Sequence, residues 1–279
     1  MASNIAGIDH AIIGVRDLEK AKAAYEKLGF RATPRGRHVG WGTANYCLMF
    51  ERDYLEILGI VDPKAFTNNL DSFLETREGL LSIVLGTSDA TATRTAWAEA
   101  GLDPAEVKDL SRLLEPDTEL RFQNVTLDAK ATADVPMFAC SQLTADQMRA
   151  PGWTEHPNGA LGIKTITAVT KDPASTVEPM SRIFGSAKIT ETDNTVAVHT
   201  GSGVLLFATP DDLDMLHPQL RLELDTDQAA LAVLSVRVRD LEAAADWLEK
   251  AKIPFKREAS GIIGVGAEHA CGVMLEFTL

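Results

Sequence analysis

Apolar and polar positions along the chain define a unit in which a strand is followed by a helix and then by further strands. The clearest copy begins with the apolar run Ile8–Val15, which is typical of a buried strand. Asp17 then occupies an N-cap position, and Leu18 and Tyr25 follow at helical spacing. Gly29 marks the end of this helix. Further segments of strand character lie near residues 30–33, 41–50 and 54–60.

The same order of segments recurs three more times, with weaker copies of the first strand. Internal repetition of this kind fixes the architecture of a chain. The repeats predict four β-α-β-β-β modules, namely module 1 (residues 5–60), module 2 (79–143), module 3 (161–210) and module 4 (229–279). A stretch rich in Pro and Gly predicts a linker at residues 144–160. The sequence therefore predicts an α+β chain.

Composition and charge narrow the range of partners. Of the 279 residues, 45% are hydrophobic, which is enough for a packed core. The net charge of -13 argues against nucleic acid and against an anionic membrane surface, because both require basic patches. No apolar run is long enough to span a bilayer. A small anionic substrate is still compatible with this charge, because one local cationic group can hold it.

Two further features predict a cytoplasmic location. The segment Met1–Asn4 has neither the charged start nor the apolar stretch of a signal peptide. Cys47, Cys140 and Cys271 are odd in number, far apart and set among apolar residues. We therefore expect free thiols in a reducing compartment.

The repeated modules and several short motifs resemble the vicinal oxygen chelate superfamily, and most closely its glyoxalase-like branch with two such domains in one chain. The motifs that carry this resemblance are Ile8-Asp9-His10, the run 38–45, Tyr54-Leu55-Glu56, the linker phrase 153–159 and the closing segment 270–277. The resemblance implies two cup-shaped mixed β-sheets, each built from two modules. It also implies a divalent metal in a cup, held by the His10 position of the first strand and the Glu56 position of the fourth strand of both modules. The metal then chelates two neighbouring oxygens of the substrate.

The residues at these positions differ between the modules. Module 1 has His10 and Glu56, whereas module 4 has Val233 opposite His10 and Glu276 opposite Glu56. If the modules paired in chain order, the first cup would contain only His10 and Glu56 and the second only Glu276, and neither set is sufficient for a metal site. We therefore predict that modules 1 and 4 share the active cup, where His10, Glu56 and Glu276 hold one metal ion (Zn, Ni, Mn, Co or Fe).

Modules 2 and 3 are predicted to form a structural cup without a metal. The first-strand positions hold Ser82 and Thr165, whose hydroxyls are poor ligands for these metals. The last strand of module 2 has nothing acidic near residues 138–140, and that of module 3 is apolar at 205–207.

A second group of candidate residues lies beside the metal positions. An unperturbed histidine titrates near neutrality, so His38 is a candidate base, with Glu56 or Glu276 as the alternative base. Thr43 and Asn45 face the same way along a strand and are candidate substrate contacts. Trp41 is a candidate wall of the pocket. The alternative interpretation is that His38 lies in a loop, that Thr43 and Asn45 only stabilise a turn, and that Trp41 only packs in the core.

The resemblance implies a metal-dependent lyase or isomerase that acts on a small molecule with vicinal oxygens and stabilises an enolate-like intermediate. Arg35 and Arg37 are candidates to balance an anionic substrate. Alternatives are an extradiol-type dioxygenase, a protein that sequesters a small molecule, and a fold that has lost catalysis. The substrate and the oligomeric state stay open, with a homodimer as one candidate assembly.

Overall fold

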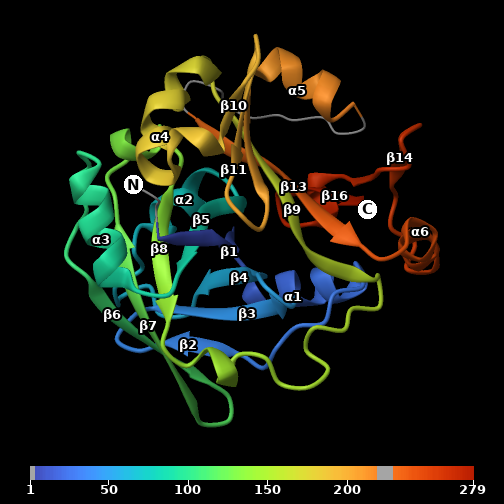
Figure 1. Ribbon diagram of the computed structural model, residues 1–279. Helices are drawn as coiled ribbons and strands as arrows, with labels where there is room; N and C mark the ends of the chain where they lie inside the picture. The colour runs from blue at the N-terminus through green and yellow to red at the C-terminus, as the bar shows by residue number, and fades with distance from the viewer. Residues whose placement is uncertain (1–3, 219–228) are drawn as a thin grey trace.

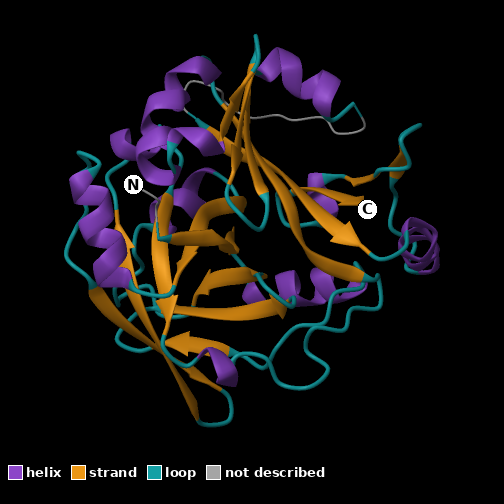
Figure 2. Cartoon of the chain, viewed as in Figure 1, coloured by secondary structure: helices purple, strands orange, loops and turns teal. Residues whose placement is uncertain are grey.

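The computed structural model describes residues 4–218 and 229–279. Residues 1–3, on which the predicted location partly depends, lie outside the described residues. Figure 1 shows two bodies of strands that lie side by side, with helices packed around them (Figure 2). Among the described residues, no helix has the length and apolar character needed to cross a membrane.

Modules 1 and 2 together form a closed barrel with the strand order β1-β4-β3-β2-β6-β7-β8-β5. The elements of module 1 are β1 (Ile5–Val15), α1 (Leu18–Lys27), β2 (Gly36–His38), β3 (Thr43–Met49) and β4 (Tyr54–Ile60). The helix α2 (Leu70–Thr76) connects the two modules. The elements of module 2 are β5 (Gly79–Thr87), α3 (Ala90–Glu99), β6 (Lys108–Leu114), β7 (Thr118–Thr126) and β8 (Met137–Gln142).

Modules 3 and 4 form an eight-stranded sheet with the order β10-β11-β12-β9-β13-β16-β15-β14. The elements of module 3 are β9 (Ala160–Val169), α4 (Val177–Phe184), β10 (Ile189–Glu191), β11 (Thr195–His199) and β12 (Val204–Ala208), and α5 (Pro210–Leu216) follows them. The elements of module 4 are β13 (Ala230–Val238), α6 (Leu241–Lys250), β14 (Lys256–Arg257), β15 (Ile263–Val265) and β16 (Met274–Thr278). The predicted α+β class with two mixed sheets is confirmed, and each sheet has eight strands.

The strand order corrects the predicted pairing of the modules. β1 pairs antiparallel with β5, and β9 pairs antiparallel with β13, so module 1 joins module 2 and module 3 joins module 4. The predicted pairing of modules 1 and 4 rests on the ligand-type side chains that it would bring together. Backbone ladders between consecutive modules decide the pairing instead, as is usual for segments joined by short connections.

In most modules, the helix that follows the first strand begins at an aspartate, as the sequence predicts for Asp17. The predicted N-cap Asp17 accepts a hydrogen bond from the backbone of Lys20 at the start of α1. Asp89 and Asp240 cap α3 and α6 in the same way. An aspartate therefore begins the helix directly after the first strand in three of the four modules.

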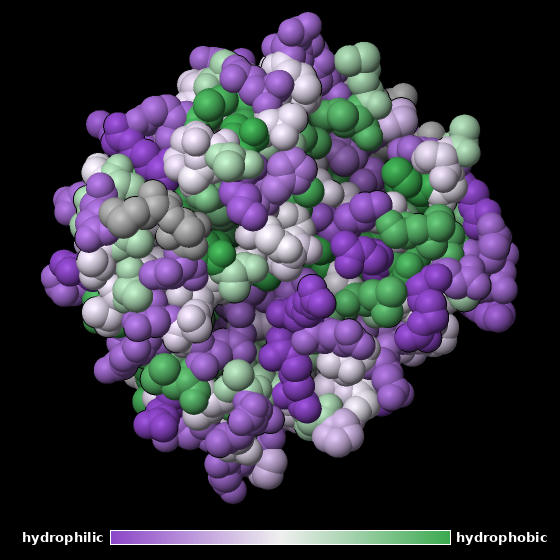
Figure 3. Space-filling view, viewed as in Figure 1, coloured by the Kyte–Doolittle hydropathy of each residue, from purple (hydrophilic) through white to green (hydrophobic). Residues whose placement is uncertain are grey.

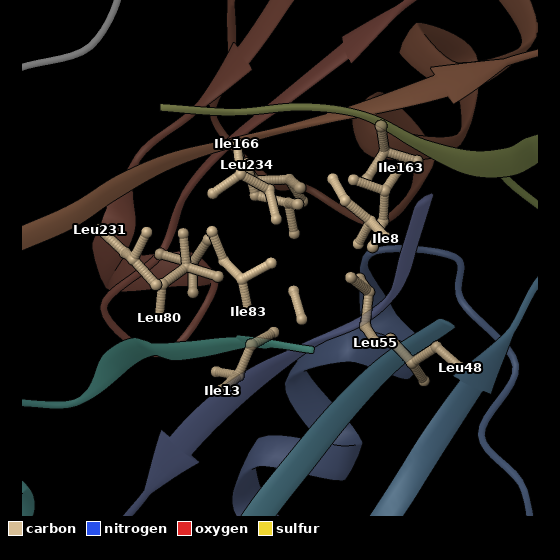
Figure 4. Packing of buried hydrophobic residues seen from close by; sticks show 14 of the residues in the cluster. Ile8, Ile13, Leu48, Leu55, Leu80, Ile83, Ile163, Ile166, Leu231 and Leu234 are labelled. Atoms are coloured by element: carbon tan, nitrogen blue, oxygen red, sulfur yellow. The ribbon is translucent and has the colours of Figure 1, made fainter. Parts of the chain in front are cut away.

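One apolar core lies between the barrel and the second sheet. Figure 4 shows barrel residues such as Ile8, Ile13 and Leu55 facing Ile166 and Leu234 of the second sheet. The outer side of β1 is thus buried against the second sheet. The face of the molecule in Figure 3 shows hydrophobic residues only as separate patches among hydrophilic ones, which is normal for a protein surface.

A bulge in β1 decides which side chains enter the barrel. The pairing of β1 with β5 shifts register between Ile8 and His10. Ile8 therefore packs in the core between the two bodies, whereas His10 lines the barrel cavity. Further along the strand, Ile12 faces the cavity and Ile13 faces the core.

The predicted linker is fastened to module 1. The ring of His156 accepts a hydrogen bond from the backbone of Arg31 through Nδ1 and donates from Nε2 to the carbonyl of Met49. Asn158 is fully buried and donates to the carbonyl of Leu28. These polar groups serve the connection between the two bodies and do not reach the barrel cavity.

Candidate active site

The barrel encloses a cavity of about 780 Å³. Strands of both module 1 and module 2 line it, and most of its walls are apolar. Its buried polar side chains include His10 on β1, His38 on β2, Glu56 on β4 and Arg112 on β6. All four lie on strands of the barrel, whose backbone ladders hold them in place.

His10 is held by a carboxylate and by an aromatic ring. Its Nδ1 donates to Asp9 Oδ2 at 2.6 Å, and Gln142 Nε2 donates to the other oxygen of Asp9 at 2.6 Å. The imidazole stacks on Tyr54, with 4.2 Å between the ring centroids. These contacts direct Nε2 of His10 toward Glu56 Oε2, 3.3 Å away. Burial lowers the pKa of His10, but the bonds to Asp9 and Glu56 outweigh burial and raise this pKa above its ordinary value.

Glu56 lies at the centre of the buried polar group. Asn45 Nδ2 donates to Glu56 Oε1 at 2.5 Å, as expected of two residues whose strands β3 and β4 are paired. Burial raises the pKa of Glu56, but the bond from His10 and the charges of His38 and Arg112 outweigh it and lower the pKa to about 2. Glu56 is therefore ionised at neutral pH.

His38 has the opposite protonation behaviour to His10. Its Nδ1 is 2.8 Å from the hydroxyl of Thr43, and its Nε2 is 3.7 Å from Glu56 Oε1, which is too long for a hydrogen bond. Burial lowers the pKa of His38 to about 4, with the charges of Arg112 and His10 acting in the same direction. His38 is therefore neutral at pH 7, with Nε2 facing the cavity.

Of the predicted substrate contacts, Trp41 and its neighbours line the entrance. The ring of Trp41 lies 5.5 Å from that of His38 and makes an edge-to-face contact with Phe66 at 5.0 Å. Thr43 and Asn45 are buried behind the cavity and act on it through His38 and Glu56.

Arg112 is the functional candidate that the sequence reasoning missed. Its side chain is only 3% exposed, and its Nη1 donates to Cys47 Sγ at 3.1 Å. The detectable signal was an arginine at an inward position of an alternating strand. The two arginines that we named instead do not line the cavity: Arg35 lies 3.7 Å from Glu19, and Arg37 is exposed.

Glu276 lies in the second sheet, away from His10 and Glu56. Its Oε1 is 2.7 Å from His217 Nδ1, and Ser235 Oγ donates to its Oε2 at 2.7 Å. The predicted ligand set is therefore not brought together. The side chain that lies beside His10 and Glu56 is His38 instead of Glu276.

The family of the chain follows from comparison with known proteins. A family model described as a glyoxalase-like domain matches residues 8–184, which is more than half of the chain. The chain belongs to the glyoxalase-like domain family. No curated protein matches this glyoxalase-like chain.

Solved structures match this glyoxalase-like protein along almost its whole length. A hypothetical protein from Staphylococcus aureus has 13% sequence identity and a TM-score of 0.70, with 97% of this chain and 98% of that chain covered. A triple variant of 4-hydroxymandelate synthase from Streptomyces coelicolor has 13% identity and a TM-score of 0.58, with 98% and 92% covered. A fusion of a xylose isomerase-like TIM barrel with 4-hydroxyphenylpyruvate dioxygenase has 12% identity and a TM-score of 0.57, with 99% and 49% covered. At these identities the likeness is one of fold.

Members of the wider superfamily commonly use a divalent metal, so the fit of the cavity to one can be tested. The bond from His10 Nδ1 to Asp9 is the orientation that metal-binding histidines usually have. The matching strands of module 2 supply Ser82, whose hydroxyl donates to a backbone carbonyl, and the buried thiol of Cys140. Among residues 4–218 and 229–279, no three His, Cys, Asp or Glu side chains are arranged to hold a metal ion. A catalytic metal usually has three protein ligands, so a metal would fit only after His10, His38 and Glu56 shift from the positions in which they face one another.

Proposed function

We propose that this chain is a small-molecule enzyme of the glyoxalase-like type that moves a proton at a carbon next to a carbonyl group. The observation that carries this proposal is the pair of imidazoles in the barrel cavity, both with Nε2 toward Glu56 and with pKa values displaced in opposite directions. Environments that separate the pKa values of two neighbouring groups are typical of an acid and a base in one site.

Each imidazole then has a definite part in the reaction. In the tautomer in which Nδ1–H of His38 donates to the hydroxyl of Thr43, the lone pair of Nε2 is free to take a proton from the substrate carbon. Asp9 and Glu56 favour the protonated form of His10, whose Nε2–H, 3.3 Å from Glu56 Oε2, can be shared with a substrate oxygen on which negative charge develops. Return of the proton to another carbon gives an isomerase, and loss of a leaving group gives a lyase.

The cavity supports a substrate of ordinary small-molecule size. Its volume of about 780 Å³ lies within the range usual for such sites. A substrate with two neighbouring oxygens can present one of them to His10 while its acidic carbon faces His38. Glu56 lies between the two imidazoles and balances the charge of a protonated His10.

Hydrogen–deuterium exchange tests this proposal without knowledge of the product. A panel of 2-oxo acids, 2-hydroxyketones and their esters is incubated with the protein in D₂O, and loss of the carbon-bound proton is followed by NMR. We expect at least one compound to exchange, and His38→Ala to slow its exchange by about 100-fold or more. His199→Ala, which changes an exposed histidine of the second sheet, should leave the rate unaltered. Binding without exchange by any compound would instead favour a sequestering protein.

A metal-dependent lyase or isomerase is the second candidate, favoured by one observation. Both Nδ1 atoms are occupied, by Asp9 and Thr43, so the Nε2 atoms of His10 and His38 face the same carboxylate. Elemental mass spectrometry of untagged protein after exposure to Zn, Ni, Mn, Co and Fe decides it. About one metal per chain that is lost in His10→Ala would support the metal enzyme. Iron together with oxygen consumption would favour the dioxygenase.

A further inference from the structure

Arg112 is a buried cation with fewer partners than a buried cation normally has. A guanidinium carries five N–H donors, and buried charges are usually paired with an opposite charge and fully hydrogen-bonded. Arg112 donates to the thiol of Cys47, which is a weak acceptor, and its buried Nε has no hydrogen-bond partner. The guanidinium also lies 5.4 Å from the ring of Phe122, a contact that satisfies no N–H donor.

The nearby carboxylates do not complete this pairing. Within the part of the chain that the structure describes, no carboxylate forms an ion pair with Arg112, while Glu56 already receives bonds from Asn45 and lies against His10. Arg112 lines the cavity. The N–H groups of Arg112 on the cavity side can therefore take a partner from a ligand.

The position of Arg112 relates this partner to the proposed base. In the antiparallel pairing of β2 with β6, Arg112 lies directly opposite His38. Side chains of directly opposed residues lie on the same face and are close neighbours. A group held by Arg112 would thus lie beside Nε2 of His38.

The rest of the cavity favours an apolar body for the ligand. Its walls include Ile12, Leu58, Leu110 and Phe138, and the charged residues that also line it, Lys108, Asp109 and Asp134, are exposed. Phe66, which packs on Trp41 at the entrance, is 57% exposed although it lines the cavity. An aromatic rim of this kind extends the apolar surface beyond the buried chamber.

We propose that the barrel cavity binds an amphipathic monocarboxylic acid, whose carboxylate pairs with Arg112 and whose apolar body extends along the walls toward Phe66. The proposal rests on the proposed function, because it names the substrate class of that same site. One guanidinium matches one carboxylate, with two parallel N–H···O bonds. A phosphate dianion would bring more charge into apolar surroundings than this single cation can balance.

Calorimetric binding of matched acids and amides tests the proposal. The probes are 3-phenylpropanoate and octanoate, their primary amides, and propanoate as an acid without a large apolar body. Wild-type protein is compared with Arg112→Met, which removes the charge at similar volume, and with Arg112→Lys. Arg121→Met is the control, because Arg121 is an exposed arginine on the neighbouring strand.

We expect each long acid to bind wild-type protein about tenfold or more tightly than its amide, and propanoate to bind weakly. Arg112→Met should remove this preference while amide binding changes by less than about twofold, Arg112→Lys should retain part of it, and Arg121→Met all of it. Phe66→Ser should weaken octanoate and octanamide by the same factor. Equal binding of acid and amide by the wild-type protein, or a preference that survives in Arg112→Met, would overturn the proposal.

Two safeguards separate this proposal from the preceding one. The comparison of acid with amide on wild-type protein needs no variant, so it decides the matter even if Arg112→Met does not fold. Absence of binding by both long acids at about 10 mM would also contradict the proposed pairing of a carboxylate with Arg112. Binding does not require proton transfer, so failure of deuterium exchange with intact acid preference would refute the proposed reaction and leave the carboxylate anchor standing.

Discussion

Asp53 gives the chain a pH-dependent stability that can be worked out from its surroundings. This residue precedes β4, is buried, and accepts a hydrogen bond from the backbone of Ile163 on β9, so it lies where the barrel meets the second sheet. Burial raises the pKa of Asp53 from 3.8 to about 7, although the bond from Ile163 and the charge of Arg237 oppose the rise. Between the two pKa values, 3.8 and about 7, Asp53 is therefore protonated in the folded protein and ionised in the unfolded chain.

The sign and the size of the effect follow from that difference. A raised carboxyl pKa contributes stability that is fully present below the unfolded value and is lost as pH rises through the folded value. For values of 3.8 and about 7, Asp53 contributes about 2.5 kcal/mol more to the free energy of unfolding at pH 5 than at pH 8. Most of the loss should occur between about pH 5 and pH 7.

Urea unfolding of wild-type protein and Asp53→Asn at pH 5, 6, 7 and 8 measures this contribution. The amide cannot titrate but keeps the oxygen that accepts from Ile163. We expect the variant to gain about 2.5 kcal/mol relative to the wild type between pH 5 and pH 8. Asp103→Asn, a change at an exposed aspartate, serves as the control. A difference between wild type and Asp53→Asn that is the same at all four pH values would refute the reasoning.

Two further changes test the packing of the barrel site and the role of the second sheet. Gly36→Ala should destabilise the fold by about 1–3 kcal/mol and slow exchange, because a Cβ at Gly36 would overlap the Asn45 amide that donates to Glu56. Gly86→Ala, where the nearest atom would be 3.5 Å away, should be tolerated, and equal thermal unfolding of the two variants would contradict this account. Glu276→Ala should cost about 1–3 kcal/mol in urea unfolding, because His217 loses a buried partner, yet leave deuterium exchange unchanged. A loss of exchange without a loss of stability would return Glu276 to the active site.

The repeats in the sequence were sufficient for the architecture but not for the arrangement of the modules. Hydrophobic periodicity and the capping aspartates report on each module separately, so four modules and two sheets could be predicted. Ligand-type residues such as His10 and Glu276 carry no information on which backbones pair. That information lies in the ladder between β1 and β5, which no local pattern reveals.

Only the part of the candidate site that comes from module 1 could be predicted, because local patterns do not show which strands of other modules lie beside it. His10, His38 and Glu56 come from one module and follow one another closely in sequence, and the structure does bring them together. Arg112 comes from module 2 and reaches the cavity only because β2 and β6 are neighbours. Its single signal was a charge at an inward strand position, and such a signal acquires meaning only when the facing strand is known.

The bulge in β1 makes the two halves of the chain depend on each other. Ser202, in the turn after β11, binds both backbone groups of Ile8, since its hydroxyl accepts from the amide at 2.9 Å and donates to the carbonyl at 3.2 Å. The proposed acid His10 lies two residues further on. The second sheet thus acts as an external clamp on the register of the strand that carries His10. If the barrel alone were grafted into another protein, a substitute for Ser202 would be needed to keep the His10 side chain directed into the cavity.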